Sequence, residues 1–254
     1  MQAPSVTNLL LAWERGLDQS PTRRALALLG ACLPEAAPDR LADLPVGARD
    51  KHLLRLRESL FGDAVAAISQ CPNCREGLDV AFSVGDISEP DGGKTGREIM
   101  ESPTQTHQLQ AEGYTIAYRV PTSADLLAIT DTPNRVEPQL ALLQRCVTGL
   151  EQDGIQARVD ALPSSVIAAI SSEMADADPQ AQIELALVCP ECSHAWSALF
   201  DIAAFLWSEI HAWAHRILQQ VHTLARVYGW READILAMSV QRRQIYLELA
   251  RSHE

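Results

Sequence analysis

Two short cysteine motifs, far apart in the chain, constrain its fold more than any other feature. They are Cys71-Pro72-Asn73-Cys74 and Cys189-Pro190-Glu191-Cys192. Each motif can present two sulfurs to one metal ion, and together they supply the four thiolates of a tetrahedral zinc site, with each sulfur about 2.3 Å from the metal. The sequence therefore predicts one structural zinc ion per chain, bound by Cys71, Cys74, Cys189 and Cys192.

The residues after each motif follow a common pattern. Every second position is apolar in both copies: Leu78, Val80, Phe82 and Val84 after the first, and Trp196, Ala198, Phe200 and Ile202 after the second. Alternation at period two is typical of a half-buried strand. We therefore interpret the two segments as matching halves of one zinc ribbon.

Three other interpretations of the motifs stay open at this point. A redox dithiol of the thioredoxin type needs a strand before the motif and a helix starting at it, whereas strands are expected after both motifs here. Four cysteines can also hold an iron–sulfur cluster. His194, two residues after Cys192, is a substitute ligand if one cysteine is not used. The strand pattern favours zinc over these alternatives.

The acidic composition narrows the classes of partner. The chain has 254 residues, 47% of them hydrophobic, and its 21 basic and 33 acidic residues give a formal charge of -12. This charge argues against a nucleic-acid backbone as the general partner. No apolar run reaches the roughly 18 residues of a membrane span, and the N-terminus lacks a signal-peptide pattern.

We therefore expect a cytoplasmic protein, in which cysteines indicate metal binding or buried thiols rather than disulfides. Cys32 and Cys146 lie singly in apolar helical contexts and are expected in the core. Of the tryptophans, we expect one or two at a partner surface among Trp13, Trp207, Trp213 and Trp230.

Helical patterns dominate both ends of the chain. Helices are predicted over residues 5–17, 20–32, 47–69, 203–228, 231–238 and 239–250. In the third, the charged residues opposite the leucines are interpreted as a solvated face, with a partner-binding patch as the alternative: Arg49, Lys51, Arg55, Arg57 and Glu58. The long fourth helix ends at Gly229, and Arg242-Arg243 is expected at the surface.

The region between the motifs mixes strand and helix patterns. It shows an isolated strand at 114–120, helices near 123–130, 137–149 and 163–176, and a strand at 183–188 that leads into the second motif. Thr122 and Asp125 resemble a capping box at the start of the first of these helices. We predict an α+β fold that is predominantly helical, with a two-knuckle zinc ribbon of short β-hairpins and a long C-terminal helix.

Six regions are expected along the chain. They are an N-terminal helical region (1–70), a first ribbon half (71–87), a flexible linker (88–112), an inserted module of a strand and helices (113–182), a second ribbon half (183–202) and a C-terminal helical region (203–254).

No complete catalytic or cofactor-binding motif is visible. Gly93-Lys94-Thr95 lacks the earlier glycine of a phosphate loop, because Ser88 stands there. His211 and His215 lie one helical turn apart, but Ala212 replaces the glutamate of a metalloprotease helix, so both are interpreted as polar or interfacial residues. A zinc ion held by four cysteines has no open position for water, and we expect no enzyme activity.

Two blocks of sequence resemble known protein families. The first comprises Asp50 to Glu58, Phe61-Gly62, the first cysteine motif and Val84 to Ile87, and it resembles the baseplate hub assembly chaperone family of T4-type phages. The second is similar to proteins encoded in gene clusters for phage-tail-like contractile injection systems; it comprises Leu187 to Cys192, Trp196, Phe200 to Ile202, Phe205 to Trp207, Tyr228 to Trp230 and Arg242-Arg243.

These resemblances imply a non-enzymatic baseplate component or assembly factor of a contractile tail-like particle. The implied partners are other baseplate, spike or tail-tube proteins, and a multimeric assembly is compatible with them. From the charge and the lack of an apolar span, we expect no nucleic acid and no membrane as partners. The chain departs from the simpler chaperone pattern in its two knuckles and its long insertion, which leaves open whether it is a transient chaperone or a resident subunit. A cytoplasmic metalloenzyme or redox enzyme, and a zinc-ribbon nucleic-acid binder, are the alternatives.

Overall fold

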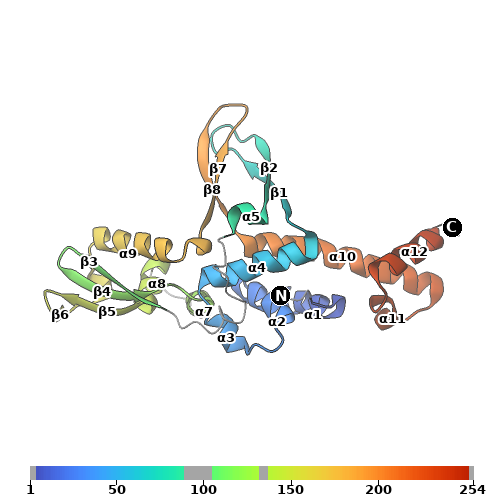
Figure 1. Cartoon of the computed structure of the whole chain (residues 1–254), viewed down its shortest axis with the longest axis horizontal. Helices are drawn as coiled ribbons and strands as arrows, with labels where there is room; N and C mark the ends of the chain where they lie inside the picture. Colours follow the sequence, from blue (N-terminus) through green and yellow to red (C-terminus); the bar gives the residue numbers. More distant parts are fainter. Residues whose placement is uncertain (1–3, 89–104, 132–136, 252–254) are drawn as a thin grey trace.

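The computed structural model describes residues 4–88, 105–131 and 137–251. Four parts can be followed in Figure 1: a central helical body, a module with a small sheet on one side, a stalk of two hairpins, and an arm at the C-terminal end. The mixture of helices with small sheets, and the long C-terminal helix, agree with the predicted fold class.

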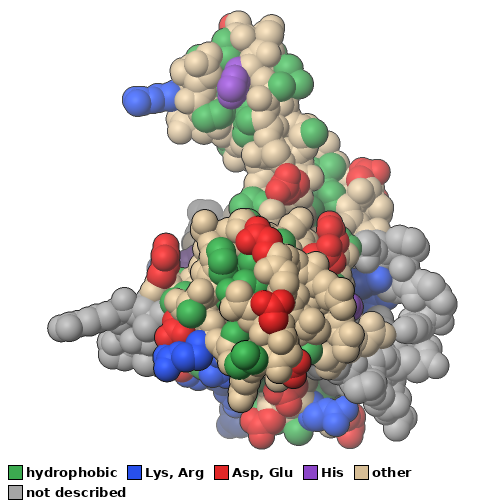
Figure 2. Space-filling model, turned by 90° about the vertical axis from the view of Figure 1, so that its left-hand side faces the viewer, with side chains coloured by type: hydrophobic (Ala, Val, Ile, Leu, Met, Phe, Trp, Pro, Cys, Tyr) green, Lys and Arg blue, Asp and Glu red, His purple; other side chains and the backbone are tan. Residues whose placement is uncertain are grey.

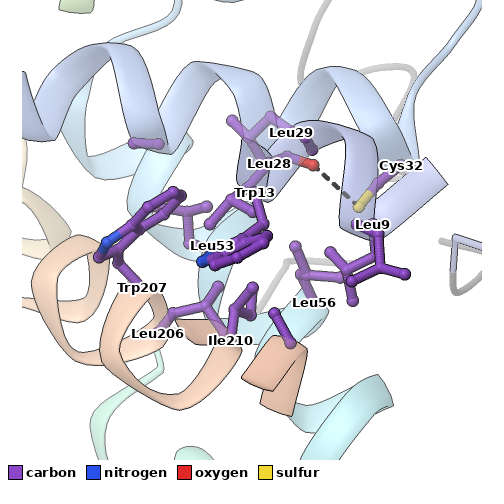
Figure 3. Close-up of a cluster of buried hydrophobic side chains, with 14 of the residues drawn as sticks. Leu9, Trp13, Leu28, Leu29, Cys32, Leu53, Leu56, Leu206, Trp207 and Ile210 are labelled. Carbon is purple, nitrogen blue, oxygen red and sulfur yellow. Dashed lines mark hydrogen bonds between the residues drawn. The ribbon is translucent and has the colours of Figure 1, made fainter. Parts of the chain in front are cut away.

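The body is a cluster of helices around one hydrophobic core. Its elements are α1 (Val6–Gly16), α2 (Pro21–Cys32), α3 (Pro38–Ala42), α4 (Val46–Phe61) and the first part of α10 (Ile202–Tyr228). Figure 3 shows side chains from α1, α2, α4 and α10 turned toward one another, including Trp13, Leu28, Leu53, Leu206 and Ile210. The core therefore joins the N-terminal helices to a helix that begins about 200 residues later in the chain.

The ends of α10 follow directly from its sequence. The Asp201 side chain caps the first turn by accepting a hydrogen bond from the Ala204 backbone N–H at 3.0 Å. Gly229 ends the helix in the left-handed region at φ 70°, which glycine adopts without steric cost. Cys32 is buried, as predicted, and its thiol donates a hydrogen bond to the Leu28 carbonyl oxygen at 3.2 Å.

The helix predicted over 47–69 is too long. In the structure α4 ends at Phe61, Gly62 adopts a φ of 87°, and the chain continues as strand β1 (Ala64–Gln70). Val65 and Ile68 fit a helical spacing, but only Val65 is buried, while Ile68 is 81% exposed. Residues 64–70 gain their hydrogen bonds from a neighbouring strand, and that long-range pairing overrides the local helical pattern.

The charged residues of α4 do not form a simple solvated face. The guanidinium of Arg57 is buried and donates two hydrogen bonds to the carboxylate of Glu209 on α10, at 3.0 and 3.1 Å. It also donates to the Gly62 carbonyl oxygen at 2.7 Å. Arg49 is buried as well, against Asp50. At these two arginines the predicted solvated face is wrong, because both side chains are buried and Arg57 joins α4 to α10.

The module contains a four-stranded antiparallel sheet in the order β3-β4-β5-β6. Its elements are β3 (Thr106–Ala111), β4 (Tyr114–Arg119), α7 (Ser123–Thr130), α8 (Pro138–Cys146), β5 (Val147–Gln152), β6 (Ile155–Gln156), the 3-10 helix η1 (Val159–Ala161), α9 (Ser164–Ala177) and the 3-10 helix η2 (Pro179–Ala181). A second hydrophobic cluster, which includes Ile116, Cys146 and Ile170, lies between the sheet and its helices.

Two predictions for this region need correction. Strand β3 lies within 88–112, which was expected to be a linker, while residues 89–104 lie outside the described part of the chain. The helix predicted over 137–149 ends at Cys146, and residues 147–152 form β5. Both new strands pair with β4, so the isolated strand predicted there is the centre of a sheet.

The capping box at the start of α7 is confirmed. Its acidic member, Asp125, also connects α7 to β4 and α8 through hydrogen bonds. Asp125 accepts hydrogen bonds from the Thr122 backbone, from Arg119 at 2.6 and 2.9 Å and from Arg145 at 2.9 Å. Burial alone would raise the pKa of Asp125, but the bonds from Arg119 and Thr122 lower it below its usual range. The carboxylate is therefore a structural anchor.

The C-terminal arm (residues 221–251) comprises the end of α10, α11 (Glu232–Leu236) and α12 (Val240–Arg251). Tyr228, Trp230 and Tyr246 pack together with ring centroids 4.5 to 5.7 Å apart. Arg243 was expected at the surface with Arg242, but it is only 2% exposed. Among all described helices, none is both long and apolar enough to cross a lipid bilayer.

Candidate metal centre

The stalk (residues 64–83 and 183–200) consists of two antiparallel hairpins that stand side by side on the body (Figure 1). The first pairs β1 with β2 (Gly77–Ser83), and the second pairs β7 (Ile183–Val188) with β8 (Ala195–Phe200). Each hairpin has a cysteine motif at its tip, in the turn between its strands. The hairpins form separate sheets, so contacts between them come from side chains.

The two tips have the same backbone geometry. The Cys71 backbone N–H donates to the Glu76 carbonyl oxygen and the Cys189 backbone N–H donates to that of His194, both at 2.9 Å. The residue after each second cysteine, Arg75 or Ser193, has a positive φ, of 66° and 55° respectively. Each motif is therefore a tight knuckle that turns both of its sulfurs to one side.

The four sulfurs converge between the tips. The Cys71 and Cys192 sulfurs are 3.7 Å apart, those of Cys74 and Cys189 are 3.6 Å apart, and all four lie within 4.8 Å of one another. A tetrahedron with metal–sulfur bonds of about 2.3 Å has sulfurs separated by roughly 3.8 Å, whereas a disulfide requires about 2.05 Å. The spacing fits four ligands around one metal ion, and the structure brings together all four cysteines singled out in the sequence.

The thiols affect one another's ionisation. Hydrogen bonds from the Asn73 side chain and the His194 backbone lower the pKa of Cys192 to about 6. At Cys74 the Glu76 backbone N–H favours the thiolate, but desolvation and the neighbouring sulfurs outweigh it and raise the pKa to about 12. Four thiolates this close repel one another, so a bound cation is needed to balance them all.

The site lies at the edge of the molecule. Cys71 and Cys189 are buried, Cys192 is half-buried and Cys74 is exposed. A metal ion there would be ligated on all four tetrahedral positions, with one thiolate facing solvent. Such a centre can hold two hairpins together, and it offers no open position at which water or a substrate could be activated.

Below the site, apolar side chains fill the space between the hairpins. The predicted alternation holds: Leu78, Val80 and Phe82 on β2 are half-buried, as are Trp196, Ala198 and Phe200 on β8. At the base, the Phe82 and Phe200 rings meet edge to face with centroids 5.2 Å apart. The helices that follow, α5 (Val84–Ile87) and α10, both begin with a buried apolar residue, Val84 or Ile202.

The geometry also bears on the alternative interpretations. A strand precedes each knuckle, which was not foreseen for the first, but a strand and not a helix follows both. The thioredoxin arrangement is therefore absent from the stalk. His194 stacks on Trp196 and is not part of the sulfur cluster. Across the described residues, this cluster is the single group of three or more side chains placed to hold a metal ion.

The histidine pair on α10 has a structural role. His211 Nδ1 accepts a hydrogen bond from the Trp13 indole N–H at 3.1 Å, and His215 packs against the edge of the same tryptophan. This bond requires the proton of a neutral His211 to sit on Nε2, which leaves no lone pair there for a metal. Gly93-Lys94-Thr95, set aside as a phosphate loop, lies outside the described residues.

Comparison with known protein families identifies the family of this chain. A family model described as T4 bacteriophage base plate protein matches residues 6–207, which cover α1 to α4, the module, the whole stalk and the start of α10. The chain belongs to this baseplate family. The predicted resemblance to T4-type baseplate proteins is thereby confirmed. The match ends within α10, so the C-terminal arm lies beyond it. No curated protein and no solved structure matches the chain.

Proposed function

We propose that this chain is a non-enzymatic component or assembly factor of the baseplate of a contractile, phage-tail-like particle. In this proposal a zinc ion bound by Cys71, Cys74, Cys189 and Cys192 holds its stalk closed. The observation that carries it is the convergence of four thiols at the tip of a stalk that lies inside the region matched by the baseplate family. The partners are other baseplate, spike or tail-tube proteins.

The chemistry of the site supports zinc and a structural role. Four thiolates are the ligand set of closed structural zinc sites, in which the metal contributes folding energy and no catalysis. Here the metal would join two hairpins that share no backbone hydrogen bonds. Removing it would leave the tips to be held by side-chain contacts near the base, such as Phe82 against Phe200.

Metal analysis of the purified chain tests the zinc site. We expect about one zinc per chain and no absorption in the visible range. Cys74→Ser should lose the zinc, because three thiolates and a neutral hydroxyl do not complete the site. Cys32→Ser is the matched control: its hydroxyl can keep the hydrogen bond to the Leu28 carbonyl oxygen, and it should retain the zinc. Stoichiometric iron with visible absorption, or full zinc retention by Cys74→Ser, would overturn the assignment.

Association with particles tests the baseplate role. A tagged chain recovered from producing cells should co-purify with baseplate, spike or tail-tube proteins. Its presence in finished particles identifies a resident subunit, whereas its presence in assembly intermediates alone identifies an assembly chaperone. Enzymatic turnover or salt-sensitive DNA binding without any such partner would contradict the proposal.

A further inference from the structure

The stalk exposes apolar side chains on its outer surface. Ile68, 81% exposed, lies on the outer face of the first hairpin. On the opposite side of the stalk, Val188 and Leu199 are 63% and 70% exposed on the outer face of the second hairpin. Figure 2 shows hydrophobic side chains along the stalk where it rises from the body. A hairpin with one face in solvent normally carries polar residues there, so this outer face has the composition of a contact surface.

The outer face of the stalk is also acidic. The stalk contains four carboxylates against one arginine, a net charge of -3 with histidine neutral: Glu76, Asp79, Glu184 and Glu191, with Arg75. Within its four strands the charged residues are Asp79, on the outer face of the first hairpin, and Glu184, on the outer face of the second. A complementary surface would be apolar and basic.

The C-terminal arm of the same chain has that composition. Val240, Ile245 and Leu249 on α12 are 69%, 56% and 46% exposed. Arg242, exposed, precedes Ile245 by three positions and Leu249 by seven, so the three lie on one face of the helix. Residues 221–251 contain five arginines and three acidic residues, a net charge of +2, whereas the remainder of the chain carries -14.

The arm also contains a buried positive charge. Arg243 is 2% exposed, and its Nη1 atom has no hydrogen-bond partner. A buried guanidinium is partly desolvated, and its positive potential extends to the nearby surface. Carboxylates brought against the arm would therefore be attracted to it.

We propose that the outer face of the second hairpin of the stalk (β7 and β8), which carries Val188, Leu199 and Glu184, binds the C-terminal arm of a second copy of this chain. The stalk rises from the middle of the body and the arm extends beyond one end of it, so the two surfaces meet between copies (Figure 1). The contact joins different surfaces on the two copies, and such head-to-tail contacts build rings or open chains. The proposal goes beyond the baseplate role by naming one occupant of the stalk, and it requires a closed stalk.

Mixing two variants of the full-length, zinc-loaded chain tests this contact. Leu199→Arg disables the stalk and Ile245→Glu disables the arm, and both side chains are exposed, so neither change disturbs a core. Wild type should show concentration-dependent association by light scattering. Each variant alone should associate at least about thirtyfold more weakly, as expected for a central contact residue. An equimolar mixture should recover a dimer and stop there, because one intact stalk meets one intact arm.

Ile155→Arg is the control, since Ile155 is 73% exposed on β6 in the module and should leave association unchanged. A monomeric wild type at all concentrations, variants that associate normally, or a mixture that stays monomeric would each overturn the proposal. Zinc measured on the same samples separates this outcome from failure of the metal site: zinc-loaded monomers refute the self-contact alone, and zinc-free protein refutes the closed stalk. Binding of the stalk to another baseplate protein, with a monomeric wild type, would assign it a different occupant.

Discussion

The body and the stalk are adjacent in space but are held together in different ways. The body buries side chains of five helices in one core, in which Leu28, Leu53 and Leu206 are completely buried. The stalk has thin hairpins, exposed apolar residues and a sulfur cluster at its tip. The difference indicates that hydrophobic burial is enough for the body, whereas two-stranded hairpins, marginal on their own, need a cross-link.

Removal of the metal should produce the largest difference in stability between the stalk and the body. Structural zinc sites in small peptides bind with apparent free energies of about 10–16 kcal/mol, so its loss should open the stalk. We expect hydrogen exchange of the β1 and β7 amides to become fast after chelation, while helical circular dichroism changes little. Added zinc should restore protection. Loss of the helical signal together with the stalk would show that the two parts fold as one unit.

A core substitution in the body should have the opposite effect: it should destabilise the body and leave the stalk closed. Leu53→Ala removes a side chain with 0% exposure, and we expect a loss of about 3 kcal/mol in the free energy of unfolding, measured by urea titration. Zinc should stay bound in the native state. Leu199→Ala, at a position 70% exposed, is the control and should change stability by less than about 0.5 kcal/mol. Equal losses in the two variants would contradict the comparison.

Acid should weaken the body through His52 on α4. This side chain is 2% exposed, neither ring nitrogen has a hydrogen-bond partner, and burial lowers its pKa from 6.5 to about 4. The unfolded chain therefore takes up a proton first: the contribution of His52 is complete above pH 6.5 and is lost as the pH falls toward 4. The loss by pH 5 is roughly 2 kcal/mol.

His52→Leu removes this group, so its stability should fall less between pH 7 and pH 5 than that of wild type. Urea titrations of both proteins at each pH, after complete removal of zinc, measure the difference without a contribution from the thiolates. Parallel curves for the two proteins would show that His52 does not titrate on unfolding.

The smallest effect is expected at the base of the stalk. Phe82→Leu removes the edge-to-face contact with Phe200, an interaction of about 1 kcal/mol. Zinc affinity, measured by competition with a chelator, should fall a few-fold because the hairpins are less well aligned before the metal binds. Tyr114→Leu in the module should leave it unchanged. An unaltered affinity in Phe82→Leu would mean that the knuckles alone align the sulfurs.

The sequence predicted the site more completely than the fold around it. The knuckles impose their own geometry, so the cysteines could be grouped without knowledge of the body, and α10 carries both a periodic apolar face and a C-terminal glycine. The misassigned segments are short strands, which depend on partners distant in the chain. Two signals were available: Glu112-Gly113 and Asp153-Gly154 are two-residue hairpin turns in which both residues have positive φ.

The burial of charged side chains was the second feature that could not be predicted from the sequence. Arg57 looks like any exposed helical arginine in the sequence, and its burial depends on Glu209, which follows 152 positions later. Arg243 gave no sequence signal of burial either, because its neighbour Arg242 is exposed on the same helix. Pairing and burial of this kind are set by tertiary packing, which the local pattern does not contain.

The separation of the two knuckles also sets an order of events during synthesis. The second knuckle lies 118 positions after the first, and at a typical rate of about 5–20 residues per second its cysteines emerge roughly 6–24 s later. Until then Cys71 and Cys74 lack the other two cysteines of the sulfur cluster, and α1, α2 and α4 lack the helix that covers them. The sulfur cluster and the core are therefore completed at nearly the same moment, by the same stretch of nascent chain.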